Sequence, residues 1–340
     1  MQELKHPIVS VCIANYNGIG VIEACIASVK AQIGDLPVEI IVHDDASSDE
    51  SVDYFRTQHP DVTLIQSSEN VGFCISNNRL ASQAQGQYLL LLNNDAELLT
   101  DALTSLYQAT QDLGVPAILG LPQYDATSGA LLDAGSLLDP FLNPIPNLDL
   151  NRRQVGMVMG ACLWIPKTLW HELDGFPTWF GSIGEDLYLC CRARLAGYPV
   201  IALNASGFRH RVGHSFGGGK VLQNRLITSR KRRALSERNK SYVLVLSYPT
   251  PYLEFFFALH IVALVLEGVI ITITKLEIQI WNRIYLECLK ALWKQRGLLR
   301  DLRRTIQKNK RVSTREFFAV FKWYPYKIRM LWKHGIPTIQ

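Results

Sequence analysis

The chain has 340 residues, of which 48% are hydrophobic, so it can bury a sizeable core in one large domain or two. Its net charge of +5 is unevenly distributed, because residues 1–219 carry 11 basic and 23 acidic residues whereas residues 220–340 carry 24 and 7. Seven cysteines, odd in number and without a CxxC pair, argue against a disulfide framework and indicate a reducing compartment. The N-terminal residues lack the charged start and long apolar run of a signal peptide.

Short apolar runs alternate with segments of helical spacing in the first part of the chain. The predicted strands are residues 8–14, 38–45, 62–68 and 87–92, and the predicted helices are residues 21–32, 51–59 and 75–85. This alternation predicts an α/β fold with a Rossmann-like, mostly parallel sheet flanked by helices. In such a sheet the ligand crevice lies beyond the carboxyl ends of the strands.

Three of these strands end in polar clusters. The first runs into "ANYNG" (residues 14–18), the second into "DDASS" (residues 44–48), and the strand "QYLLLL" into "NND" (residues 93–95). Asn, Asp, Ser and Gly also form turns and helix caps, which is the alternative for any single cluster. Three such clusters on one rim favour a ligand site.

The next segments are less regular. Residues 115–160 are rich in Pro, Gly and Asp, as a long insertion over a site would be. We expect a strand at residues 160–166 and a helix from about Glu185 to Gly197, followed by another strand. Residues 207–220 read as a glycine-rich loop that carries two histidines.

The last third of the chain is basic and predicted to be helical. Residues 251–274 are about as long as a membrane span, but Glu254, His260 and Glu267 would be costly at a bilayer centre. A deep interfacial or re-entrant amphipathic helix is therefore favoured over a transmembrane helix. The following mixture of Trp, Tyr, Leu and basic residues suits anionic headgroups. The alternatives are a soluble helical subdomain and, less well supported because long aliphatic runs interrupt the basic residues, a nucleic-acid-binding tail.

Six segments in this order resemble a family 2 glycosyltransferase with the GT-A fold: "VSVCIANYN", "EIIVHDDASSDES", "SSENVGFCISNN", "GQYLLLLNNDAEL", "GACLWIPKTLW" and "GEDLYLCCRARLAGY". The resemblance covers about residues 7–219, and the tail is similar to those of bacterial members that act on lipid-linked acceptors. It implies a nucleotide-sugar-binding catalytic domain at residues 1–219 and a basic, apolar, membrane-associating region at residues 220–340.

The resemblance also implies a donor site and a Mg²⁺ or Mn²⁺ site. Asp95 matches the last acid of the family's metal-binding motif, His210 matches a late metal-contacting histidine, and His214 is the alternative. A bound cation neutralises the diphosphate leaving group, and hard cations prefer oxygen ligands. The first acid of the motif is absent here, a variant familiar among rhamnosyltransferase-like members. The implied nucleotide-sugar-binding residues are Asn15, Tyr16, Asp45, Asn78, Asn93 and Asn94.

The catalytic base is expected at the start of the helix near residue 185. Asp186 matches the family's base, and Glu185 would orient the acceptor or support the loop. The family inverts the anomeric centre in a single displacement, so no nucleophilic residue is needed. Trp179 and Phe180 either stack on an acceptor sugar or belong to the core, and residues 121–159 are expected to shape acceptor selectivity.

These features predict an inverting glycosyltransferase of cell-surface glycan synthesis. The expected donor is dTDP-rhamnose, the acceptor is a hydroxyl of a lipid-linked or polysaccharide glycan, and no nucleic acid is involved. The expected location is the cytoplasmic face of a bacterial inner membrane, as a peripheral or monotopic protein. The alternatives are transfer from a UDP-hexose or UDP-N-acetylhexosamine and a catalytically silent, membrane-docked nucleotide-binding scaffold.

Overall fold

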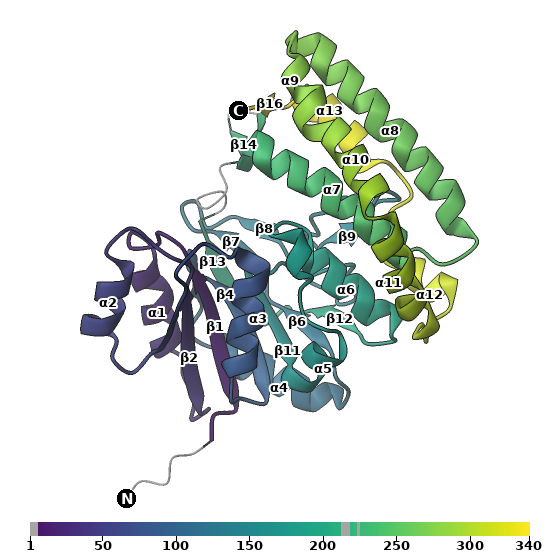
Figure 1. Cartoon of the computed structure of the whole chain (residues 1–340). Helices are drawn as coiled ribbons and strands as arrows, with labels where there is room; N and C mark the ends of the chain where they lie inside the picture. Colours follow the sequence, from purple (N-terminus) through teal and green to yellow (C-terminus); the bar gives the residue numbers. More distant parts are fainter. Residues whose placement is uncertain (1–5, 212–217, 223–224) are drawn as a thin grey trace, which may run out of the picture. The chain divides into compact units, whose positions relative to one another are not determined.

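The computed structural model describes residues 6–211, 218–222 and 225–340 and divides the chain into two compact units (Figure 1). Unit 1 comprises residues 1–136, 146–193 and 198–211. Unit 2 comprises residues 212–340 together with two short segments from the earlier part of the chain, residues 137–145 and 194–197.

Unit 1 is built on a seven-stranded sheet. In spatial order its strands are β12 (Val200–Ala202), β6 (Ile118–Gly120), β11 (Cys162–Pro166), β4 (Tyr88–Asn93), β1 (Val9–Asn15), β2 (Val38–Asp44) and β3 (Thr63–Gln66). Neighbouring strands are parallel except at β11, which runs antiparallel to both β4 and β6. The predicted α/β fold with a mostly parallel sheet is confirmed.

The pleat of the central strands sends alternate side chains to two faces. The odd-numbered residues of β1 face a core shared with α1 (Ile22–Lys30), α2 (Ser51–Gln58) and α4 (Ala102–Leu113). Helix α3 (Phe73–Gln83) packs against β1 and β2 and covers the opposite face (Figure 1). Because both faces are covered, the run of four leucines in β4 is completely buried.

Residues 115–160 are more regular than expected, so the prediction of an irregular insertion was wrong in part. This stretch contributes β6 and four further short strands, β7 (Gln123–Asp125), β8 (Leu131–Asp133), β9 (Leu137–Leu138) and β10 (Pro144–Ile145). Strands of two or three residues are too short to show a period of two in the sequence. A four-stranded sheet joins β5 (Ala96–Leu98), β13 (Phe208–His210), β7 and β8 in that order.

The glycine-rich segment at residues 207–220 begins with a strand, β13, and not with a loop. Pairing of β13 with β5 sets His210 opposite Ala96, the residue that follows Asp95. The alternative metal-contacting residue, His214, lies outside the described residues.

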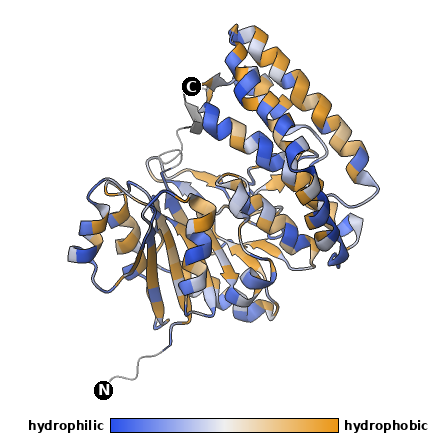
Figure 2. Ribbon diagram, in the orientation of Figure 1, coloured by the Kyte–Doolittle hydropathy of each residue, from blue (hydrophilic) through white to orange (hydrophobic). Residues whose placement is uncertain are grey.

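Unit 2 is mainly helical and combines a polar helix with a strongly apolar one (Figure 2). Its longer helices are α7 (Arg230–Ser247), α8 (Tyr252–Lys275), the π-helical segment η2 (Trp281–Leu286), α10 (Glu287–Lys294), α11 (Arg296–Lys308) and α13 (Tyr326–His334). A short sheet joins β14 (Gly218–Leu222), β15 (Arg225–Thr228) and β16 (Thr338–Ile339). Within the described part of the chain, α8 is long and apolar enough to cross a membrane by length and composition.

Candidate active site

The carboxyl ends of β1, β2 and β4 meet through side-chain hydrogen bonds. Asn15 Nδ2 donates to Asp44 Oδ1 at 3.0 Å, and Asn94 Nδ2 donates to Asn15 Oδ1 at 2.9 Å. The three polar clusters therefore share one rim of the sheet, as expected for parallel strands. Both the nitrogen and the oxygen of the Asn15 amide are hydrogen-bonded and the residue is only 1% exposed, so Asn15 joins the three strand ends.

The turn after β1 requires a glycine. A Cβ on Gly18 would lie 2.1 Å from Asn15 Oδ1 and 2.4 Å from Asn94 Nδ2, well inside van der Waals contact. The absence of a side chain at Gly18 lets the turn close over these two amides. The neighbouring Tyr16 remains 52% exposed, which leaves its ring accessible to a ligand at the rim.

Asp45 holds the loop between β3 and α3. Its two carboxylate oxygens accept hydrogen bonds from the backbone N–H groups of Val71 at 2.7 Å and Gly72 at 2.9 Å. An ionised carboxylate offers about four acceptor positions, so these two bonds leave capacity for one more donor, such as a ring N–H of a nucleobase.

Two residues expected to contact substrates have structural roles in this fold. Asn78 Nδ2 donates to the carbonyl of Phe176 at 2.8 Å, and Asn78 Oδ1 accepts from the backbone N–H of Phe176 at 3.0 Å. Both ends of its amide thus bind the backbone of Phe176, and its contact with the donor stays a prediction. Phe180 is fully buried and therefore belongs to the core, and the half-buried Trp179 packs edge-on against it at 4.7 Å.

Asp95, His210 and Gln123 form a buried hydrogen-bonded chain. His210 Nε2 lies 3.1 Å from Asp95 Oδ1, and Gln123 Nε2 lies 2.9 Å from His210 Nδ1. These distances fit a neutral ring that donates from Nε2 to the carboxylate and accepts from the amide at Nδ1. All three side chains come from the strands or strand ends of the β5–β13–β7 region, which places them close together despite their separation in sequence.

The donor set of this chain fits a divalent cation that also uses ligands from a substrate. Among the described residues, no group of three or more His, Cys, Asp or Glu side chains could hold a metal alone. Gln123 Oε1 is buried and has no hydrogen-bond partner in the described structure. Rotation of this amide would let Oε1 accept a hydrogen bond from Nδ1–H of the other ring tautomer, in which Nε2 of His210 carries no hydrogen and could bind a cation together with Asp95.

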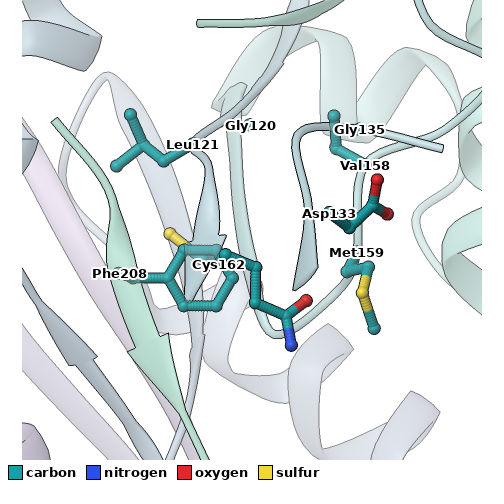
Figure 3. A pocket seen from close by; sticks show the side chains of 9 residues that line it. Gly120, Leu121, Asp133, Gly135, Val158, Met159, Cys162 and Phe208 are labelled. Atoms are coloured by element: carbon teal, nitrogen blue, oxygen red, sulfur yellow. The ribbon is translucent and has the colours of Figure 1, made fainter. Parts of the chain in front are cut away.

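A small cavity lies next to the hydrogen-bonded side chains of Asp95, His210 and Gln123 (Figure 3). Gln123 and Asp133 contribute polar groups to its wall, and the other lining residues are Gly120, Leu121, Gly135, Val158, Met159, Cys162 and Phe208. Burial raises the pKa of Asp133 to about 6, although Ser136 and the backbone of Asn147 donate hydrogen bonds to its carboxylate. Neither Gln123 nor Asp133 was predicted from the sequence, because each lies in a strand of only three residues that has no distinctive motif.

Asp186 lies at the start of α6 (Glu185–Leu195). Its carboxylate accepts hydrogen bonds from the backbone N–H of Leu187 in the same helix at 2.7 Å and from the backbone N–H of Gly160 at 3.1 Å. The helix N-terminus favours negative charge at this position. The next residue after Gly160, Ala161, accepts a hydrogen bond from the backbone N–H of Asn93 at 3.0 Å. The candidate base is thus tied to the end of β4 through one short segment. Glu185 is only 6% exposed, which favours support of the loop over contact with an acceptor.

Comparison with known proteins gives matches in sequence and in fold. Residues 10–154 match the family model of Glycosyl transferase family 2. The O-antigen chain rhamnosyltransferase WbaN of Salmonella anatum is 25% identical over 182 residues, which cover 51% of this chain and 56% of WbaN. A protein of Mycobacterium tuberculosis (strain CDC 1551 / Oshkosh), MT1568, is 33% identical over 110 residues, which cover 32% of this chain and 34% of MT1568. The matches thus span from about a third to just over half of these curated relatives.

Solved structures share the fold at low sequence identity. GalNAc-T7, crystallised with UDP, GalNAc and Mn²⁺, superposes with a TM-score of 0.59 at 15% identity and covers 75% of this chain and 51% of its own. TarS 1–349 of S. aureus, in complex with UDP, gives a TM-score of 0.53 at 14% identity over 88% of each chain. Residues 10–154 thus resemble Glycosyl transferase family 2 in sequence, and the fold of the chain is similar to that of these solved structures.

Proposed function

We propose that this chain transfers a sugar from a nucleotide-sugar donor to an acceptor hydroxyl with inversion, assisted by a divalent cation. One observation carries the proposal. Asp95, which pairs with His210, follows β4, and the Asp186 carboxylate binds the backbone N–H of Gly160, just before the adjacent strand β11; a backbone hydrogen bond from Asn93 to Ala161 joins the two segments. A site for the leaving group and a base for the acceptor are the two elements that a single displacement needs.

Asp95 and His210 would hold Mg²⁺ or Mn²⁺, with the donor diphosphate completing the coordination shell. When bound, the cation neutralises the negative charge that accumulates on the departing diphosphate. Asp95 supplies the hard oxygen ligand, and Gln123 fixes the plane of the His210 ring by its hydrogen bond at Nδ1. Tyr16, which is exposed at the rim, and Asp45, which retains acceptor capacity, are the proposed contacts for the base of the nucleotide.

Asp186 is the proposed general base. Two backbone N–H groups orient its carboxylate, and a base in such a position accelerates proton transfer by roughly 10²–10⁴-fold. The acceptor hydroxyl gives its proton to Asp186 as its oxygen attacks the anomeric carbon. The bond between that carbon and the diphosphate oxygen breaks in the same step, so the configuration inverts.

The proposed donor is dTDP-rhamnose and the proposed acceptor is a lipid-linked or polysaccharide glycan at the cytoplasmic face of a bacterial membrane. The similarity to WbaN supports the rhamnosyl donor. The similarity to UDP-bound structures concerns the fold alone, so UDP-hexose and UDP-N-acetylhexosamine donors are the competing proposals.

A thermal-shift panel of dTDP, UDP and GDP sugars with Mg²⁺ or Mn²⁺ tests the donor. A ligand that binds only the folded state raises the melting temperature in proportion to the logarithm of its concentration above Kd. We expect the largest shift with dTDP-rhamnose, and a larger shift with a UDP sugar would replace this donor assignment. Absence of any shift and of any donor turnover would overturn the enzymatic proposal in favour of a silent scaffold.

A further inference from the structure

Two polar residues in the middle part of α8, His260 and Glu267, face other helices of unit 2. His260 Nε2 lies 2.7 Å from Ser241 Oγ of α7, and the His260 side chain is 3% exposed. Glu267 pairs with Arg233 of α7 and, at 2.7 Å, with Lys327 Nζ of α13. The two groups that would be most costly in the middle of a bilayer are therefore already satisfied by other helices of the same unit.

These contacts belong to a larger ionic network that fixes α8 in place. Glu237, with a side chain only 1% exposed, pairs with Lys240 at 2.9 Å, Lys327 at 2.5 Å and Arg233 at 3.2 Å. If α8 left this bundle to cross a membrane, Arg233 and Lys327 would lose Glu267 and buried charges would be left incompletely paired. Close packing adds to this restraint, because a Cβ on Gly268 would lie 2.6 Å from the ring of Tyr285.

The opposite side of α8 is apolar and exposed along almost its whole length. Its only exposed charged residues, Glu254 and Lys275, lie at the two ends of the helix. Between them lies a strip with helical spacing, which we call the outer face; its large residues, each between 41% and 66% exposed, are Phe255, Leu259, Val262, Leu266, Val269, Ile270 and Ile273. With a rise of 1.5 Å per residue, the strip is about 27 Å long. Figure 2 shows α8 as a nearly continuous apolar helix.

Two exposed tryptophans of unit 2 have the character of membrane-interface anchors. Trp323, 61% exposed, contacts Phe256 of α8 with ring centroids 6.0 Å apart. On α10, Trp293 is 70% exposed and stacks under the Arg296 guanidinium at 4.2 Å. Exposed tryptophans beside basic residues suit the headgroup region of a bilayer. Further exposed basic residues of α10 and α11 are Lys290, Lys294, Arg300, Arg304 and Lys308.

We propose that the outer face of α8 docks unit 2 onto one leaflet of an anionic lipid bilayer, with α8 lying in the plane of the membrane. The apolar strip enters the acyl boundary while the basic residues of unit 2 meet anionic headgroups. Residues 220–340 carry 24 basic and 7 acidic residues, so the same regions of two copies of the chain would repel each other. An anionic lipid surface is therefore the favoured partner for the outer face, rather than a second copy. This orientation keeps the ionic network of α7, α8 and α13 intact.

Vesicle flotation of the full chain tests the proposal. We expect binding to phosphatidylcholine vesicles that contain phosphatidylglycerol, weaker binding to pure phosphatidylcholine, and at least a tenfold loss of binding in the double variant Val262→Asp/Leu266→Asp. The matched control is Val115→Asp/Leu148→Asp, which changes two exposed apolar residues of unit 1 and should bind as the unmodified chain does. Retained melting temperatures establish that both variants are folded.

Three results would overturn the proposal. The first is failure of the unmodified chain to float, and the second is equal flotation of the outer-face variant. The third is a dimer in light scattering that dissociates in the outer-face variant without any vesicle binding, which would assign this face to a second copy. Nucleotide binding by unit 1 should be the same in both variants, so its loss would count against the proposed donor site and not against docking.

The in-plane orientation has its own readout. All seven cysteines are buried and unbridged, so Val262→Cys provides a single accessible thiol for a fluorescent label. Lipids brominated near the headgroup should quench this label more strongly than lipids brominated near the chain ends. The opposite order of quenching, together with resistance to alkaline extraction, would show a spanning helix and refute the orientation.

Discussion

Replacement of Gln123 by Met should weaken binding of Mn²⁺ about tenfold to a hundredfold. Gln123 is 3% exposed and its amide lies 2.9 Å from His210 Nδ1. Removal of a buried hydrogen-bond partner costs about 1–3 kcal/mol, which corresponds to roughly 5–150-fold. Loss of the group that orients a metal-bound histidine typically costs about 10–100-fold in affinity, so the two routes agree.

The assay is titration of the full chain with Mn²⁺, followed by electron paramagnetic resonance of the free ion, with and without dTDP. This readout does not depend on turnover. The matched variant is Gln123→Glu, whose carboxylate can accept a hydrogen bond from Nδ1–H of His210 but cannot donate one to Nδ1. It should restore binding relative to Gln123→Met, because it favours the ring tautomer that leaves Nε2 free.

Two outcomes have different meanings. If Gln123→Met binds Mn²⁺ within about twofold of the unmodified chain, or Gln123→Glu binds no better than Gln123→Met, the proposed role of the amide is refuted. If the unmodified chain itself binds no Mn²⁺, with or without nucleotide, the proposed metal site at Asp95 and His210 is refuted instead.

Three further changes test other parts of unit 1. Asp186→Asn should lower the rate of transfer by about 10²–10⁴-fold and leave the nucleotide-induced thermal shift unchanged; a rate within tenfold would remove Asp186 as the base. Gly18→Ala should lower the free energy of unfolding by about 1–3 kcal/mol in urea, whereas Gly20→Ala, with nothing within 4 Å of its added Cβ, should be nearly neutral. Burial raises the pKa of Asp133 from 3.8 to about 6, so the folded chain binds this proton more tightly than the unfolded chain and stability should fall as the pH rises through that range. Asp133→Asn should abolish this fall in a series of melting temperatures, and an unchanged profile would contradict the assignment.

The sheet was predictable because its signals are local. The strands at residues 8–14 and 87–92 are continuous apolar runs long enough to identify, and the polar clusters that end them necessarily meet at one rim of a parallel sheet. The hydrogen bond between Asn94 and Asn15 confirms this meeting at the level of side chains.

The roles of individual side chains were less predictable, because they depend on contacts between distant segments. Asn78 and Phe176 are 98 positions apart, and nothing in either segment indicates that the backbone of one uses the amide of the other. The same holds for Gln123 and His210, which meet only because β13 pairs with β7. On α8, composition predicted a membrane-active helix, but the inward position of His260 and Glu267 depends on the bundle of unit 2.

The hydrogen bonds from Asn93 to Ala161 and from Gly160 to Asp186 connect the end of β4 to the proposed base. Adjacent strands of a sheet are about 4.8 Å apart. Here β4 leads to Asp95, and the adjacent strand β11 begins just after Gly160, whose N–H binds the Asp186 carboxylate. In the proposed mechanism, the backbone at Asn93 and residues 160–161 would therefore set the separation between the cation site and the base, independently of which sugar is bound. Exchange of the loops between residues 121 and 159 should then change which glycans are accepted and leave this gap unchanged. That separation would make the domain a suitable starting point for engineering new acceptors by loop replacement.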